Sequence, residues 1–213
     1  MTDALIPTTP DEAFDKLLAG NQRFVTGAPS HPNQDAARRA EIAPAQSPFA
    51  VMFGCADSRL AAEIIFDQGL GDLFVVRTAG HVVGTEVLGS VEYGVSVLDC
   101  PLVVVLGHDS CGAVAAARAA VENGTAPGGF VRDVVERVTP SVLAAHAAGH
   151  TEEREILHEH IRNTVDLLVE RSRALADGVA SGRTAVVGMA YQLADGTAEL
   201  VAAHGLSKSL TGR

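Results

Sequence analysis

Two short segments of this sequence bring together side chains that bind metals and move protons. The first reads Cys55-x-Asp57-x-Arg59, and the second holds His108 and Cys111 in a His-x-x-Cys spacing. One histidine and two cysteines form a donor set that suits zinc and leaves one coordination position open. A carboxylate and a guanidinium follow the first cysteine closely, so they are placed to handle a proton beside the metal. The pattern predicts a catalytic zinc site.

The residues around the predicted metal have separate expected roles. A zinc ion with two thiolate ligands is a weaker Lewis acid than one with three histidines, because the thiolates cancel its formal charge. We expect Asp57 to compensate by accepting a hydrogen bond from the zinc-bound water, and Arg59 to hold Asp57 ionised. Asp57 is also close enough to Cys55 to act as a fourth ligand in a closed state. Cys111 precedes a predicted helix, whose N-terminus stabilises a thiolate.

Two apolar runs must position these segments. Residues 49–53 are typical of a buried strand that ends just before Cys55, and residues 102–106, rich in valine, predict a second strand that leads to His108. In open α/β sheets the carboxyl ends of the strands are where ligands bind. The two strands are therefore expected to deliver their ligands to one edge of a parallel sheet.

The remaining periodicity predicts an α/β fold with a single domain. We expect a mostly parallel sheet of about four strands plus an antiparallel edge strand, flanked by helices. The other strands are predicted at residues 73–77, 184–192 and 199–203. Helices are predicted at residues 61–66, from about residue 85, at 112–122, at 129–148 with a break near Pro140, and at 151–176.

The N-terminal segment predicts a helical arm. Thr9 can cap a helix, Pro10 suits its first position, and Glu12 completes a capping box. A second short helix is expected at residues 35–42, within a proline-rich stretch. We assign residues 1–48 to this arm as part of the same domain, and residues 49–213 to the α/β zinc-binding catalytic body. The sequence leaves open whether the arm packs on its own body or reaches across to a partner.

Composition excludes several classes of protein. The formal charge of −10 over 213 residues, with no basic patch, argues against nucleic acid and anionic membranes as partners. The first residues do not resemble a signal peptide, and no apolar run is long enough to span a bilayer. Three cysteines do not make a disulfide framework. We therefore expect a cytoplasmic enzyme, in which Cys100, before a buried strand, is a small core residue.

The motifs taken together resemble the β-class carbonic anhydrases. The resemblance extends from residues 20–24 to residues 188–191, and three motifs carry it: Cys55-x-Asp57-x-Arg59, Arg77-Thr78-Ala79-Gly80 and His108-x-x-Cys111-Gly112. It implies a Zn²⁺ cofactor and the reversible hydration of carbon dioxide to bicarbonate and a proton by a zinc-bound hydroxide. It also implies a homodimer or homotetramer with active sites at the subunit interface.

The same resemblance assigns a substrate pocket. Its members by motif match are Gln46, Phe74, Tyr93 and Gly112. Phe74 and Tyr93 are expected to come from the neighbouring subunit, and the backbone N–H of Gly112 to face the substrate. The helix that carries Tyr93 also contains Gly89 and Gly94, small residues that would permit close packing against a partner.

The chain departs from the family at two places. Plant-type members carry Arg-Asn-x-Ala-Asn where this chain has Arg77-Thr78-Ala79-Gly80-His81, so His81 is interpreted as structural rather than as a proton shuttle. Some bacterial members have a tryptophan three residues before the first zinc cysteine, where it lines a regulatory bicarbonate site. This chain has Met52 there, and we do not predict that site.

Several functions other than carbon dioxide hydration would use similar residues. The same site could hydrolyse carbon disulfide or carbonyl sulfide, or could be a non-catalytic zinc-binding module, with Asp57 closing a structural site. An alcohol dehydrogenase would need Gly-x-Gly-x-x-Gly, which is absent. The spacing around Ser110 misses the Gly-x-Ser-x-Gly of hydrolases. His158 and His160 stand two apart on a helix and cannot chelate one ion, so they are expected to be surface or packing residues.

Overall fold

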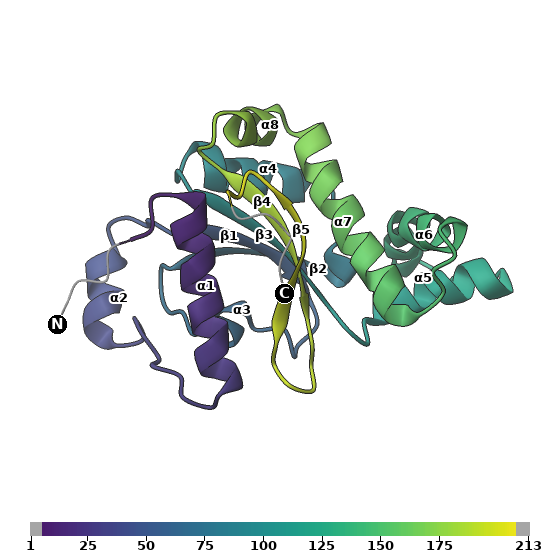
Figure 1. Ribbon diagram of the computed structural model, residues 1–213, viewed down its shortest axis with the longest axis horizontal. Helices are drawn as coiled ribbons and strands as arrows, with labels where there is room; N and C mark the ends of the chain where they lie inside the picture. The colour runs from purple at the N-terminus through teal and green to yellow at the C-terminus, as the bar shows by residue number, and fades with distance from the viewer. Residues whose placement is uncertain (1–5, 208–213) are drawn as a thin grey trace.

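The computed structural model describes residues 6–207, and its centre is one five-stranded sheet (Figure 1). The strand order is β2-β1-β3-β4-β5. The strands are β1 (Ala50–Cys55), β2 (Leu73–Thr78), β3 (Leu102–His108), β4 (Ala185–Tyr191) and β5 (Ala198–His204). β1 to β4 run parallel, and β5 pairs antiparallel with β4 at one edge. The predicted mostly parallel sheet with an antiparallel edge strand is confirmed.

Helices cover both faces of this sheet. They are α1 (Pro10–Val25), α2 (Ala36–Ile42), α3 (Ala62–Ile65), the 3-10 turn η1 (Ala79–His81), α4 (Thr85–Ser96), α5 (Gly112–Asn123), α6 (Val131–Ala147), α7 (Glu153–Arg171) and α8 (Arg173–Ala180). One face packs against α1 and α3, and the opposite face packs against α4, α7 and α8. Helices α5 and α6 pack on each other and on α7, beside the sheet (Figure 1). Every residue of β1 and β3 is buried, which explains why both strands read as continuous apolar runs.

Two helices differ from their predicted form. α6 runs through Pro140 without the expected break, and its buried residues Val138 and Val142 flank that proline. Tertiary packing of this face therefore outweighs the hydrogen bond that proline removes. The single helix predicted over 151–176 is interrupted at Ser172, whose backbone is extended and whose hydroxyl caps α8 by accepting from the Leu175 N–H at 3.2 Å.

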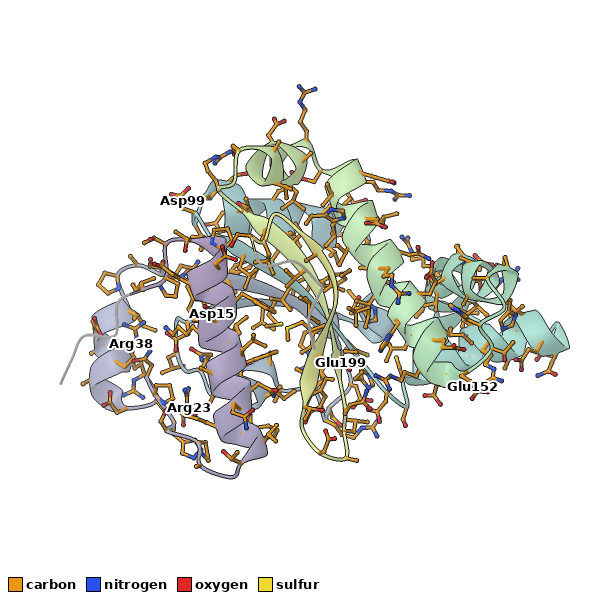
Figure 2. The ribbon with its side chains drawn as sticks, in the orientation of Figure 1. Asp15, Arg23, Arg38, Asp99, Glu152 and Glu199 are labelled. Carbon is orange, nitrogen blue, oxygen red and sulfur yellow. The ribbon has the colours of Figure 1, made fainter. Side chains whose placement is uncertain are left out.

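The N-terminal segment lies against the body of its own chain. The capping box is present: Thr9 Oγ1 accepts from the Glu12 N–H at 3.3 Å, and the Glu12 carboxylate in turn accepts from the Thr9 N–H. Asn21 of α1 donates to the carbonyl of Gly196 at 2.8 Å. Figure 2 labels Arg23 on α1, which binds Asp67 of the body. Among residues 6–207, none of the helices combines the length and apolarity that crossing a membrane requires.

Candidate metal centre and active site

Three buried donor side chains converge at the carboxyl edge of the sheet. Cys55 ends β1, His108 ends β3, and Cys111 is the N-cap of α5. Their ligand atoms all lie within 4.8 Å of one another. Only 5%, 1% and 2% of these residues is exposed, respectively. Parallel pairing brings the ends of β1 and β3 together, because Gly54 faces Leu106 in the register.

The orientation of the His108 ring leaves one nitrogen for a ligand. Its Nδ1 lies 2.7 Å from the carbonyl oxygen of Asp109. A carbonyl only accepts, so Nδ1 carries the proton and Nε2 carries a lone pair. Nε2 is buried and has no hydrogen-bond partner within the described chain. A metal ion is the natural partner of such a nitrogen, and a backbone carbonyl on the other ring nitrogen is the usual outer contact of a metal-bound histidine.

The thiols of Cys55 and Cys111 are joined by a hydrogen bond, which changes the pKa of each. The pKa of Cys55 is lowered chiefly by a hydrogen bond from Cys111, against the effect of burial, and backbone amides lower it further. The pKa of Cys111 is raised by the Cys55 thiolate and by burial. The Cys111 thiol thus donates its proton to the Cys55 sulfur. Binding of a divalent cation would displace that proton and use both sulfurs as thiolates. These donors fit a zinc ion.

Asp57 and Arg59 lie at the mouth of the donor cluster. The Asp57 carboxylate accepts from Arg59 Nε at 2.9 Å and from Arg59 Nη2 at 2.7 Å, a bidentate pairing. Hydrogen bonds from Arg59 hold the pKa of Asp57 well below its usual range. Asp57 Oδ2 is 3.9 Å from His108 Nε2. The structure thus places an ionised carboxylate next to the nitrogen that would bind the metal.

Two residues of one motif hold this arrangement, Arg77 through its side chain and Gly80 through its backbone, and the sequence alone predicted no contact for either. Arg77 donates from Nε to the Cys55 carbonyl at 2.9 Å and from Nη2 to the Asp57 carbonyl, so it fixes the whole Cys55 loop. The Gly80 N–H donates to Cys55 Sγ at 3.3 Å. Both residues belong to the Arg77-Thr78-Ala79-Gly80 motif, and that motif was the available signal.

The second ligand loop is held by residues distant in sequence. The Ser110 N–H donates to Glu153 Oε1 of α7 at 2.8 Å, and Asp109 Oδ1 accepts from the Leu193 N–H at 2.8 Å. The separations of 43 and 84 residues leave no local pattern from which either contact could be predicted.

Three of the four predicted pocket residues, Gln46, Phe74 and Tyr93, lie toward the other end of the strands from the metal ligands. Phe74 pairs in register with Val51, four residues before Cys55. At about 3.3 Å per residue, Val51 and Cys55 are separated by about 13 Å along β1. The Phe74 and Tyr93 rings are neighbours, with centroids 6.0 Å apart, and 44% of Tyr93 is exposed. Gln46 is an exposed residue before β1. One subunit therefore does not bring these three residues to its own metal ligands.

The glycines in this region differ in what they do. Gly94 was expected to favour packing against a partner helix, but a Cβ on it would lie 2.3 Å from Val51 Cγ2, so its small size serves the packing of α4 on β1. Gly89 faces open space. Gly112 is the exposed first residue of α5, directly after Cys111.

His81 is fully buried and meets the Phe53 ring edge-on at 6.5 Å. Burial lowers its pKa well below the ordinary value, so the ring stays neutral. This environment agrees with the interpretation of His81 as structural. Cys100 is also buried, and its thiol donates to the Pro48 carbonyl at 3.3 Å, as expected for a core residue.

Solved structures identify the class of this fold. A tetrameric β-carbonic anhydrase from Sordaria macrospora superposes with a TM-score of 0.70 at 19% identity, covering 90% of this chain and 98% of that one. A Coccomyxa β-carbonic anhydrase in complex with acetazolamide superposes with a TM-score of 0.68 at 22% identity, covering 87% and 84%. The architecture is that of the β-carbonic anhydrases.

Sequence comparison gives the family. Residues 50–198 match the family model described as "Carbonic anhydrase". "Carbonic anhydrase 2" from Mycobacterium tuberculosis is 58% identical over 193 residues, which cover 91% of this chain and 93% of the relative. "Carbonic anhydrase" from Mycolicibacterium smegmatis is 57% identical and covers 91% and 94%. The chain belongs to the β-class carbonic anhydrase family of lyases, and the predicted family is confirmed.

Proposed function

We propose that this enzyme hydrates carbon dioxide reversibly to bicarbonate and a proton, with Zn²⁺ held by Cys55, His108 and Cys111. The observation that carries the proposal is the buried Nε2 of His108, which lacks a hydrogen-bond partner among residues 6–207 and lies beside two thiols. The high identity to relatives named carbonic anhydrase supports the choice of substrate. When bound, zinc supplies Lewis acidity that makes water nucleophilic near neutral pH.

Asp57 orients the attacking water rather than keeping its proton. Its pKa is held low by Arg59, so it is a weak base that accepts a hydrogen bond without becoming protonated. Arg59 fixes the carboxylate, and Arg77 fixes the loop that carries it. The released proton passes to solvent or buffer, because His81 is fully buried and cannot exchange with bulk water.

We further propose that the substrate pocket is completed by a second subunit. Phe74, Tyr93 and Gln46 lie at the opposite strand end from the metal ligands, so a neighbouring copy must supply them if they contact the substrate. The name of the Sordaria structure, a tetrameric enzyme, supports assembly into a dimer or tetramer. The Gly112 N–H, at the start of α5, faces the substrate in this arrangement.

Two further assignments complete the proposal. The N-terminal arm, residues 1–48, is part of the same domain as the catalytic body, residues 49–213, because Asn21 and Arg23 are bonded to that body. A cytoplasmic location suits three cysteines that are all free.

The deciding experiment measures carbon dioxide hydration by stopped flow on the zinc-loaded protein, together with zinc content by elemental analysis. We expect rapid hydration by the parent and loss of both zinc and activity in Cys111→Ser. Cys100→Ser is the matched control, since that thiol is buried in the core and away from the ligand set, and it should keep both. A zinc-loaded parent that is no faster than Cys111→Ser would contradict the proposal, and hydrolysis of carbon disulfide or carbonyl sulfide would then be assayed.

A further inference from the structure

A buried histidine outside the ligand set is connected to the metal centre by hydrogen bonds. His160 of α7 is 3% exposed and lies between α6 and the η1 turn. Its Nδ1 is 2.9 Å from Ser141 Oγ, and its Nε2 is 2.9 Å from the Gly80 carbonyl oxygen. Because a carbonyl only accepts, Nε2 must carry the proton, and Nδ1 accepts from the Ser141 hydroxyl. One ring nitrogen of His160 is therefore a hydrogen-bond donor and the other is an acceptor.

Gly80 carries the connection to the ligand. Its carbonyl accepts from His160, while its N–H donates to Cys55 Sγ at 3.3 Å. Its backbone has φ 63° and ψ 22°, a left-handed conformation that glycine adopts readily. A Cβ at this position would lie 2.6 Å from Ala113 Cβ, so no other residue fits without movement. The direction of the N–H that reaches the sulfur thus depends on a turn whose carbonyl His160 holds.

We propose that His160 is a positioning residue for the metal centre, which acts through Gly80 to keep a hydrogen bond on the Cys55 sulfur. This inference rests on the proposed function only in requiring that the site binds a metal. Hydrogen bonds to a ligating sulfur tune the metal–thiolate bond, and partners outside the ligand set affect metal affinity. His160 therefore contributes to the affinity of the site and to the electronic character of the Cys55–metal bond.

The protonation state of the ring agrees with this role. Burial lowers the pKa of His160, opposed by the Gly80 carbonyl and the Cys55 charge. The ring is therefore neutral, with one donor for Gly80 and one acceptor for Ser141. His81 lies against it, with ring centroids 4.3 Å apart, so a pure packing role is the competing explanation.

Two variants separate these explanations. In His160→Gln the side-chain amide reaches about as far as Nε2 and can still donate to Gly80. In His160→Asn the amide reaches only the Nδ1 position, so Ser141 keeps a partner and Gly80 loses its donor. Both remove the ring that packs on His81. The probe is Co²⁺, with affinity measured by competition against a chelator and the thiolate-to-cobalt absorption band recorded. His158→Asn, on the same helix, is the control.

We expect His160→Asn to weaken Co²⁺ binding by about tenfold, the low end of effects from residues outside the ligand set, and to shift the absorption band. His160→Gln and His158→Asn should resemble the parent in both measurements. Parent-like affinity and spectrum in His160→Asn would overturn the proposal. Equal losses in His160→Asn and His160→Gln would overturn it too, because they would show that only ring packing matters.

A measurement on the unsubstituted protein tests the proposal even if His160→Asn does not fold. Nitrogen NMR of the imidazole, assigned with His160→Gln, should show the proton on Nε2. A proton on Nδ1 would mean that the Gly80 carbonyl receives no bond, and the proposal would fail. None of these readouts uses carbon dioxide, so a failure here is distinct from a failure of the proposed activity.

Discussion

Asp57 accepts three hydrogen bonds from a single residue, Arg59: one from its backbone N–H at 2.9 Å and two from its guanidinium, from Nε at 2.9 Å and Nη2 at 2.7 Å. This geometry fixes the carboxylate plane and keeps the group ionised. Ionisation and orientation are the two properties that the proposed water-orienting role of Asp57 needs, whereas the proposed zinc ligands are other residues. The proposal therefore predicts that catalysis and ligation are separable at this position.

We expect Asp57→Asn to keep its zinc and to lose hydration rate by about 10²–10⁴-fold, the usual contribution of a positioned acid–base group. Zinc content by elemental analysis and rate by stopped flow check this. Ser58→Ala, an exposed position between the two charged residues, is the control and should remain active. Full activity in Asp57→Asn would show that the aspartate is only structural.

At the scale of elements, Asp67 ties the N-terminal arm to the α3 region. Its buried carboxylate accepts from the Ser30 and His31 N–H groups, each at 2.9 Å, and from Arg23 of α1. Burial alone would raise its pKa, but the hydrogen bonds outweigh burial and lower it. Because the folded-state pKa lies below the unfolded value of about 4, the stabilisation is complete above that pH and is lost as pH falls below it.

We expect Asp67→Asn to lower the free energy of unfolding by about 1–3 kcal/mol at pH 7, since the donors around it lose a buried, charged acceptor. The difference from the parent should shrink below about pH 4, where the parent carboxylate becomes protonated. Urea unfolding across pH 3–7 measures it. Asp177→Asn, an exposed aspartate of α8, is the control. An equal difference at every pH would contradict the assignment.

The sequence predicted correctly those elements whose burial appears directly in their pattern of apolar residues. β1 and β3 could be predicted because strands buried on both faces need unbroken apolar runs. The candidate ligands Cys55 and His108 could then be placed at one edge of the sheet, because they end those strands. Ser172 interrupts a long helix because its backbone is extended, and the residues around it in sequence carry no pattern that predicts this break. The bond from His160 to Gly80 joins positions 80 residues apart, and such contacts depend on how elements pack rather than on local spacing.

At the scale of the whole molecule, the proposed sharing of the pocket between subunits can be tested by complementation. Cys111→Ser lacks a metal ligand but keeps Tyr93, whereas Tyr93→Ala keeps the ligands but lacks the aromatic wall. In a mixed dimer, one site combines intact ligands with an intact Tyr93 from the other subunit. We expect an equimolar refolded mixture to recover roughly a quarter of the activity of the parent, in addition to that of the separate variants.

Sedimentation at micromolar concentration accompanies that experiment and should show no monomer. The matched control mixes Cys111→Ser with Cys55→Ser, which cannot form a complete ligand set in either subunit and should stay inactive. An active monomeric parent would refute the shared pocket, and so would a mixture no more active than the sum of its components.

The antiparallel outer strand has a consequence for behaviour in concentrated solution. Pairing of β5 with β4 is irregular between Gly188 and Met189, and Glu199 on β5, labelled in Figure 2, is bound by Arg154. Irregular pairing and charged side chains discourage another chain from extending a sheet at its edge. With a formal charge of −10, copies also repel one another at long range. This edge is therefore protected against fibrous aggregation.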